Sequence, residues 1–190
     1  MSKLAAVFVD GVTTQKMLLW LGIAIAFMLS FAIYFVPEIR SLSGMRPIDT
    51  QVPITPEIIF SNLAQYPPEA IRVYAWFLLV DCFYPATLAA FIAYFWSWTI
   101  RYCDARKLRR YALMGFVLLP FAGALLDVCE NIGFWLIIRA WPEEELWNVA
   151  RIATGFRQAK LTVQIADILI TLGMLGLLIK TWFNKNQTNG

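Results

Sequence analysis

Four long apolar runs constrain this chain more than any other feature of its sequence. They cover residues 17–36, 73–100, 111–138 and 161–179, and crossing the hydrocarbon core of a bilayer takes roughly 20 helical residues. Hydrophobic residues make up 59% of the chain and charged residues 15%, whereas about 25% of the residues of a soluble domain are charged. The sequence therefore predicts an all-α polytopic membrane protein, a four-helix transmembrane bundle that forms a single domain over residues 1–190.

The segments that join these runs on one side carry signals for two short helices. The predicted outer loop, 37–72, holds six of the nine prolines, and within it Thr55, Pro56 and Glu57 form a typical helix start. We expect a helix near 56–65. Pro142, followed by three glutamates, predicts a second helix over 142–154 that ends at Gly155. Both helices are expected to be extracytoplasmic and to lie at the membrane interface.

Positive charge predicts the orientation of the bundle. The N-terminal arm, the link 101–110 and the C-terminal tail together hold nine Lys/Arg residues and two acids, whereas the opposite loops hold seven of each. Lys and Arg accumulate on the cytoplasmic side of membrane proteins. We therefore expect a multi-pass protein of the plasma (inner) membrane with both termini in the cytoplasm. The basic link is interpreted as a topology determinant that touches lipid headgroups, which makes membrane lipids the expected partners and excludes nucleic acid.

The absence of histidine removes several kinds of chemistry. Histidine is the commonest metal ligand and the side chain that titrates nearest to neutral pH, so His-based zinc sites and catalytic triads are excluded. The three cysteines are interpreted as small apolar side chains rather than as disulfide partners. The chain also has no glycine-rich phosphate loop, and no cofactor is predicted.

Four acidic residues lie inside the predicted spans: Asp81, Asp127, Glu130 and Asp167. A charged side chain in the middle of a bilayer costs roughly 2.5 to 3.5 kcal/mol on insertion scales. At about 1.5 Å of rise per residue, all four acids lie roughly 13 to 18 Å below the outer ends of their helices. Three different helices are thus predicted to bring carboxylates to one layer of the membrane.

Polar residues with helical spacing accompany these acids. Asn131 follows Glu130 on the stripe that begins at Asp127, and Lys160 and Gln164 lie seven and three residues before Asp167. In the second span Pro85 cannot donate a hydrogen bond to the carbonyl of Asp81, so we expect the helix to bend there, with Tyr84 on a nearby face. The candidate ligand-binding residues are Asp81, Asp127, Glu130, Asn131, Asp167, Gln164, Lys160 and Tyr84.

The number of carboxylates leaves three functions open. In a purely structural network, Lys160, Arg157, Asn131, Gln164 and tyrosines would pair the acids and fix the helix register of a structural or accessory subunit. Because Lys160 alone is clearly within reach, some acids must instead be protonated, solvated, or neutralised by a bound cation. This surplus favours an outward-facing site that binds or transports a small cation, an amine or a lipid headgroup. The third function is a membrane-embedded lipid-modifying enzyme in which Glu130 or Asp127 serves as general acid or base, with or without a divalent ion.

A wider pattern resembles a family of uncharacterised bacterial four-helix membrane proteins. Its elements are Arg46-Pro47, the Thr55-Pro56-Glu57 helix start, Tyr74, Asp81-Cys-Phe-Tyr-Pro85, Leu119-Pro120 and Leu126-Asp127-Val-Cys-Glu130-Asn131. The resemblance covers roughly residues 17 to 180. It implies the same four-span topology and singles out the same acids, without implying a reaction.

Overall fold

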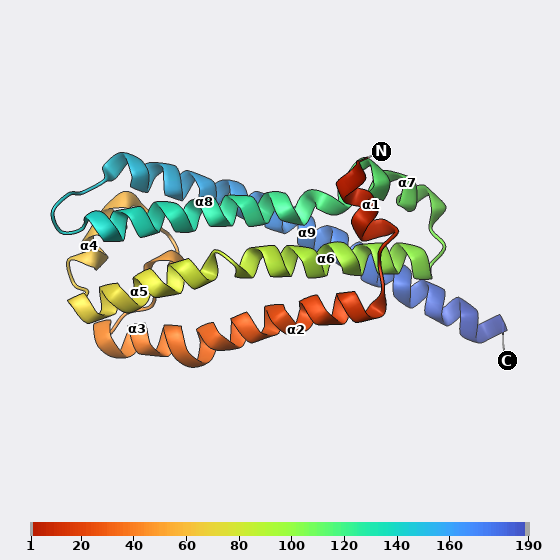
Figure 1. Cartoon of the computed structure of the whole chain (residues 1–190), viewed down its shortest axis with the longest axis horizontal. Coiled ribbons are helices and arrows are strands. Elements are labelled where there is room, and N and C mark those ends of the chain that lie inside the picture. The colour runs from red at the N-terminus through yellow and green to blue at the C-terminus, as the bar shows by residue number, and fades with distance from the viewer. Residues whose placement is uncertain (1, 189–190) are drawn as a thin grey trace.

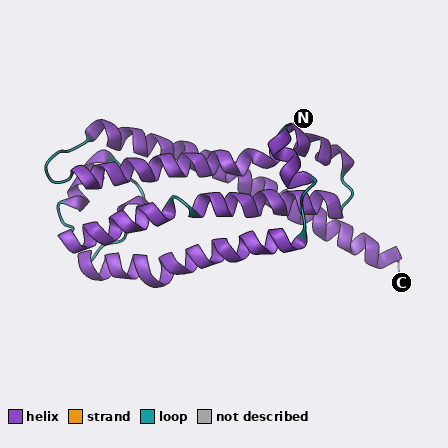
Figure 2. Ribbon diagram, viewed as in Figure 1, coloured by secondary structure: helices purple, strands orange, loops and turns teal. Residues whose placement is uncertain are grey.

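The computed structural model describes residues 2–188, and within that range the regular structure is entirely helical (Figure 1, Figure 2). Four helical stretches are long and apolar enough to cross a membrane: Thr14–Ser43, Pro68–Tyr102, Phe116–Ala140 and Trp147–Gln187. They run along the long axis of the molecule, and the two chain ends lie at the same end of it (Figure 1). The predicted all-helical fold with four candidate membrane spans is confirmed.

The first stretch is longer than the predicted run 17–36. It combines α2 (Thr14–Ser30), a π-helical turn (Phe31–Phe35) and α3 (Val36–Ser43), and it ends at Gly44 in the left-handed conformation, with φ 72°. The prediction that the loop begins at Pro37 is wrong. The wider π turn lies just before Pro37, where it accommodates a residue that lacks a backbone donor, so the helix continues.

The second stretch is interrupted where Pro85 predicts a bend. Helix α5 (Pro68–Asp81) ends at Asp81 and α6 (Tyr84–Tyr102) begins three residues later, with Cys82 and Phe83 in a turn between them. The break is visible between the two ribbons in Figure 2. Pro85 occupies the first turn of α6, where its missing N–H costs no helical hydrogen bond.

The third stretch begins later than the predicted run 111–138. Tyr111 belongs to a separate amphipathic helix, α7 (Arg106–Met114), which ends at Gly115 with φ 119°. A 3₁₀ turn (Phe116–Leu118) then leads into α8 (Leu119–Ala140). Helix α7 packs with α1 (Lys3–Val9), which the sequence analysis did not predict, at the end of the bundle that carries the chain termini (Figure 1).

The opposite end is covered by α4 (Pro56–Leu63), which forms where the sequence predicts a helix, preceded by a short 3₁₀ turn (Ile48–Thr50). Thr55 caps α4 by accepting a hydrogen bond from the Ile58 N–H at 3.4 Å. The second short helix, expected over 142–154, does not exist as a separate element. Instead α9 begins at Trp147 and runs unbroken through Gly155 to Thr188. A single glycine inside a long helix lowers its stability but does not end it.

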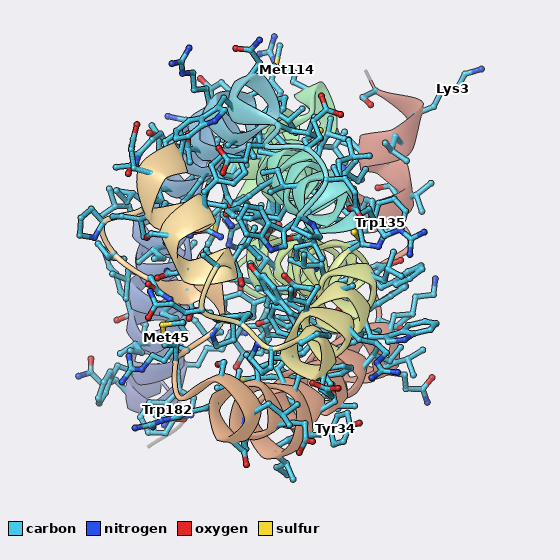
Figure 3. The ribbon with its side chains drawn as sticks, turned by 90° about the vertical axis from the view of Figure 1, so that its left-hand side faces the viewer. Lys3, Tyr34, Met45, Met114, Trp135 and Trp182 are labelled. Carbon is cyan, nitrogen blue, oxygen red and sulfur yellow. The ribbon has the colours of Figure 1, made fainter. Side chains whose placement is uncertain are left out.

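Two apolar clusters fill the bundle, one toward each end. The cluster near α4 includes Ile59, Tyr74 and Phe134, and the cluster near the termini includes Phe8 and Trp96. Along α8 the two clusters are separated by the segment that carries Asp127, Glu130 and Asn131, so the polar layer lies between two apolar cores. Figure 3 looks along the bundle from the α4 end and shows α4 and the loop around Met45 lying across the ends of the long helices.

Candidate functional site

An ion network joins α8 to α9 in the middle of the bundle. Lys160 Nζ donates to Asp127 Oδ1 at 2.9 Å and also pairs with Glu130 Oε2, and Arg157 Nη1 lies 3.5 Å from Glu130 Oε1. The side chain of Glu130 is 1% exposed, and those of Lys160 and Arg157 are 14% and 10% exposed. Two acids spaced i, i+3 on one helix thus face two cations spaced i, i+3 on its neighbour.

Close contact between the two backbones makes this pairing possible. A Cβ atom added at Gly133 would lie 2.7 Å from the Cβ of Ala153, and one added at Gly123 would lie 3.3 Å from a methyl group of Val163. Small residues let transmembrane helices approach closely. Asp127 and Glu130 lie between these two glycines along α8. The close contacts on either side of them keep α8 and α9 near enough for the acids of α8 to pair with the cations of α9.

Asp81 reaches the same layer from α5. Its Oδ2 accepts a hydrogen bond from Asn131 Nδ2 at 3.0 Å. Since Asn131 follows Glu130 on α8, this bond attaches the end of α5 to the helix that carries the ion network. The break before α6 places Asp81 at a helix terminus, where it can turn toward α8.

Arg157 also holds the loop that follows α3. Its guanidinium donates to the backbone carbonyl oxygens of Asp49 and, at 2.9 Å, of Gln51. The hydroxyl of Tyr74 accepts from the Asp49 N–H at 3.0 Å, and Asn62 Nδ2 donates to Gln51 Oε1 at 2.9 Å. The loop is therefore attached to α4, α5 and α9. Arg157 connects it to the buried Glu130, because the same guanidinium contacts both.

Burial raises the pKa values of two side chains in and beside this loop, Asp49 and Tyr66. Asp49 Oδ1 is buried and has no hydrogen-bond partner, and burial raises the pKa of the Asp49 carboxyl above its ordinary value despite the nearby Tyr74 and Arg157. The hydroxyl of Tyr66 donates to the Arg46 carbonyl oxygen at 2.6 Å. Burial raises the pKa of Tyr66 to about 12, so this hydroxyl stays protonated at physiological pH.

A cavity of about 430 Å³ adjoins the ion network between α6, α8 and α9 and is open to the surface of the bundle beside the exposed Ile168 and Leu172. Asp127, Gln164, Asp167 and Tyr84 supply polar groups to its lining, and most of the remaining wall is apolar, including Leu88, Phe91, Ile92, Pro120, Ile168 and Leu172. Asp127 belongs to both the cavity and the ion network. The cavity is thus an apolar space with acidic groups on one side.

Asp167 differs from the other acids of the layer because no residue of the described part of the chain pairs with it. The residue is 7% exposed, and its Oδ1 is buried without a hydrogen-bond partner. No cation lies within ion-pair distance of it among residues 2–188. A buried carboxylate without a partner is costly, so Asp167 is the acid of the layer whose burial the described residues leave uncompensated.

The eight predicted site residues fall into two adjoining groups. Asp127, Glu130 and Lys160 form the ion network, with Asp81 and Asn131 bonded beside it, and Gln164, Asp167 and Tyr84 line the cavity with Asp127. Arg157, which was counted with the outer loops for charge and named with Lys160 as a partner of the acids in the structural alternative, is buried and faces Glu130. Its position three residues before Lys160 places both cations on the same side of α9.

Asp49 and Gln51 were not predicted to be part of the site, because they contact Arg157 through backbone carbonyl groups, which no side-chain motif reports. Tyr74, an element of the family pattern, accepts a hydrogen bond from the backbone N–H of Asp49. The part of the chain described here contains no group of three or more carboxylate or thiol side chains placed to hold a metal ion. In the ion network the cation positions beside the carboxylates are filled by Lys160 and Arg157.

Comparison of the chain with models of protein families, with curated protein sequences and with solved structures finds no match.

Proposed function

We propose that this protein binds an amphiphilic amine, a protonated amino group attached to an apolar tail, in the cavity between α6, α8 and α9. The observation that carries the proposal is Asp167, a buried carboxylate that faces an apolar cavity and has no partner. Such a group is stabilised by a cation that also donates hydrogen bonds, and charge-assisted hydrogen bonds of this kind are the strong ones.

The charge of the layer supports a cationic ligand. Asp81, Asp127, Glu130 and Asp167 bring four carboxylates to it, and Lys160 and Arg157 bring two cations. One further positive charge beside Asp167 would reduce this imbalance. An anionic ligand would increase it.

The cavity wall supports a ligand with an apolar tail rather than a bare cation. Phe91, Ile92 and Leu172 line the space beyond the acids, and they offer no oxygen ligands to an inorganic ion. The hydroxyl of Thr171, which also lines the cavity, already accepts a hydrogen bond from Trp96 Nε1 at 3.0 Å. A hydrocarbon chain packs against this wall through van der Waals contacts, which are the source of apolar packing energy inside a bilayer.

The test uses a tetradecylamine probe and the purified full chain in detergent. The amine is expected to raise the melting temperature of the wild type, because a ligand at 100 times its Kd stabilises the folded state by about 2.7 kcal/mol. Tetradecanol, which has the same tail without the charge, is expected to have no comparable effect. Asp167→Asn keeps the shape of the side chain and is expected to abolish the response to the amine.

Asp104→Asn is the matched control, because Asp104 is an exposed acid in the link between α6 and α7, away from the cavity. This variant loses the same charge and should keep the full response. Equal stabilisation of wild type and Asp167→Asn by the amine, or equal stabilisation of the wild type by the alcohol, would refute the proposal.

One observation favours a second function, that of a structural or accessory subunit. The contacts of Lys160 and Arg157 join α8, α9 and the loop around Asp49 into one unit, with Glu130 only 1% exposed. On this alternative the acids only fix the packing of the helices. An Asp167→Asn variant that behaves as wild type with every amine tested, alongside a strong loss of stability on Lys160→Met, would support it.

The same burial of Glu130 disfavours its use as the general acid or base of an enzyme, because a substrate could not reach it.

We further propose that the protein lies in the plasma membrane with both termini in the cytoplasm and α4 on the outer side. The uneven distribution of Lys and Arg supports this orientation. A cysteine introduced at the exposed Thr50, in a variant without native cysteines, should react with an impermeant maleimide in intact cells. One introduced at the exposed Lys107 should react only after lysis. The opposite labelling pattern would reverse the orientation.

A further inference from the structure

A second groove, of about 500 Å³, lies between the first turns of α5 and the last turns of α8. It shares no lining residue with the cavity that contains Asp167, and the inference drawn from it does not depend on the proposed amine site. Trp135, one of its lining residues, lies on the side of the bundle where α5 and α8 adjoin (Figure 3).

Two arginines without acidic partners line this groove. Arg72 of α5 and Arg139 of α8 are exposed, and neither makes a hydrogen bond or an ion pair within the described part of the chain. By contrast, Arg157 is bonded to Glu130 and to the loop, and Arg109 is paired with Asp10 at 2.7 Å. The guanidinium of Arg139 lies 5.7 Å from the centre of the Trp135 ring, which orients it without neutralising its charge.

The guanidinium groups fit a phosphate by charge and by geometry. Arginine presents several N–H donors in one plane and binds phosphate oxygens in pairs. Both arginines stand at one end of helices that are apolar enough to span a membrane. This is the level at which lipid headgroups meet a transmembrane helix.

The rest of the groove follows the order of groups in a phospholipid. On α5, Arg72 is followed at i+4 by Trp76 and at i+7 by Leu79, and all three line the groove. These steps correspond to about 6 Å and about 10 Å along the helix axis. Trp76 is 61% exposed and Leu79 39% exposed, so both can contact a ligand. The cation thus stands at the end of the span, an amphipathic aromatic ring lies one turn deeper, and an aliphatic side chain lies two turns deeper.

We propose that this groove binds a membrane phospholipid, with Arg72 and Arg139 donating hydrogen bonds to its phosphate and with an acyl chain lying along Trp76 and Leu79. Glu143, which also lines the groove, makes no ion pair with either arginine. It is exposed in the turn that follows α8, beyond the end of the span. The bound lipid would bridge α5 and α8 at the end of the bundle that carries α4.

Native mass spectrometry of the detergent-solubilised full chain tests the proposal. The protein is stripped of copurifying lipid and then incubated with dioleoyl phosphatidylglycerol, with dioleoylglycerol, which lacks the phosphate, or with inorganic phosphate. The wild type is expected to retain the phospholipid and neither of the other two probes. The double variant Arg72→Gln/Arg139→Gln is expected to retain about tenfold less phospholipid, as the loss of two charge-assisted contacts at a half-exposed site implies.

The double variant Arg40→Gln/Arg151→Gln is the matched control, since it removes two exposed arginines from the same end of the molecule without altering the groove. It should retain phospholipid as the wild type does. Circular dichroism and gel filtration verify the fold of both variants. Arg72→Lys/Arg139→Lys keeps the charge without the planar donor pair and should give intermediate retention.

Three results would overturn the proposal. Equal retention by the wild type and Arg72→Gln/Arg139→Gln would show that the groove does not hold the lipid. An equal loss in Arg40→Gln/Arg151→Gln would reduce the effect to overall charge. Retention of dioleoylglycerol as strong as that of the phospholipid, or binding of inorganic phosphate alone, would remove the lipid phosphate from its assigned role.

Discussion

Replacement of Lys160 by methionine tests the ion network most directly. The change keeps the length and the apolar stem of the side chain and removes the ammonium group that serves both Asp127 and Glu130. Removing one partner of a buried ion pair costs about 3–5 kcal/mol, because the other charge is left buried. Arg157 stays 3.5 Å from Glu130 Oε1, so we expect Lys160→Met to lower the free energy of unfolding by about 3 kcal/mol, the lower end of that range.

A double-mutant cycle separates the pair interaction from other effects of the substitution. Glu130→Gln leaves Lys160 paired with Asp127, so it should cost only about 1–2 kcal/mol. In the double variant Lys160→Met/Glu130→Gln no carboxylate remains unpaired at position 130. Its loss of stability should therefore be at least about 1 kcal/mol smaller than the sum of the two single losses.

The free energies are measured by reversible unfolding with dodecyl sulfate in mixed micelles, followed by circular dichroism. Lys107→Met is the control, because Lys107 is an exposed lysine on α7 and surface substitutions usually change stability by less than about 0.5 kcal/mol. If Lys160→Met changes stability as little as the control does, or if the two single losses add without coupling, the ion network does not hold α8 to α9 and the reasoning fails.

Three further predictions concern other parts of the fold. Burial raises the pKa of Asp49 in the folded state, so the folded protein binds this proton more tightly than the unfolded chain. Stability should then fall as pH rises from the ordinary aspartate value of 3.8 through the raised one. Asp49→Asn should remove that part of the pH dependence in unfolding titrations and increase stability at neutral pH, and an unchanged pH profile would contradict this. Gly133→Ala should lower the free energy of unfolding by about 1–3 kcal/mol, because the new Cβ would lie 2.7 Å from that of Ala153. Gly155→Ala, which meets no atom within 4 Å, should be neutral or stabilising by up to about 1 kcal/mol, and similar losses for the two glycine variants would refute the close helix contact. Without an amine, Asp167→Asn should raise the melting temperature, because it removes a buried carboxylate that has no partner; a lower melting temperature would indicate a partner for the carboxylate.

Much of the candidate site can be predicted from the sequence because membrane insertion makes charged residues conspicuous. An acid within a long apolar run stands out without any knowledge of the fold, and equal depth on three helices predicts that such acids meet. The bend at Pro85 also follows from local chemistry, since a proline cannot donate the helical hydrogen bond. The helix start at Thr55-Pro56 is readable for the same reason, because capping involves only neighbouring residues.

The sequence by itself thus determined the all-helical fold, the four long apolar helices, and the layer at which Asp81, Asp127 and Glu130 lie, because these depend on hydrophobic length and on groups within one or two helical turns. Only the tertiary structure decided which acids are paired. Arg157 reaches Glu130 and the loop at Asp49, and such partners more than 25 residues apart are chosen by helix packing and loop docking rather than by any local pattern. The same packing leaves Asp167 without a partner beside a cavity, a distinction invisible in the sequence because all four acids lie in similar apolar surroundings along the chain.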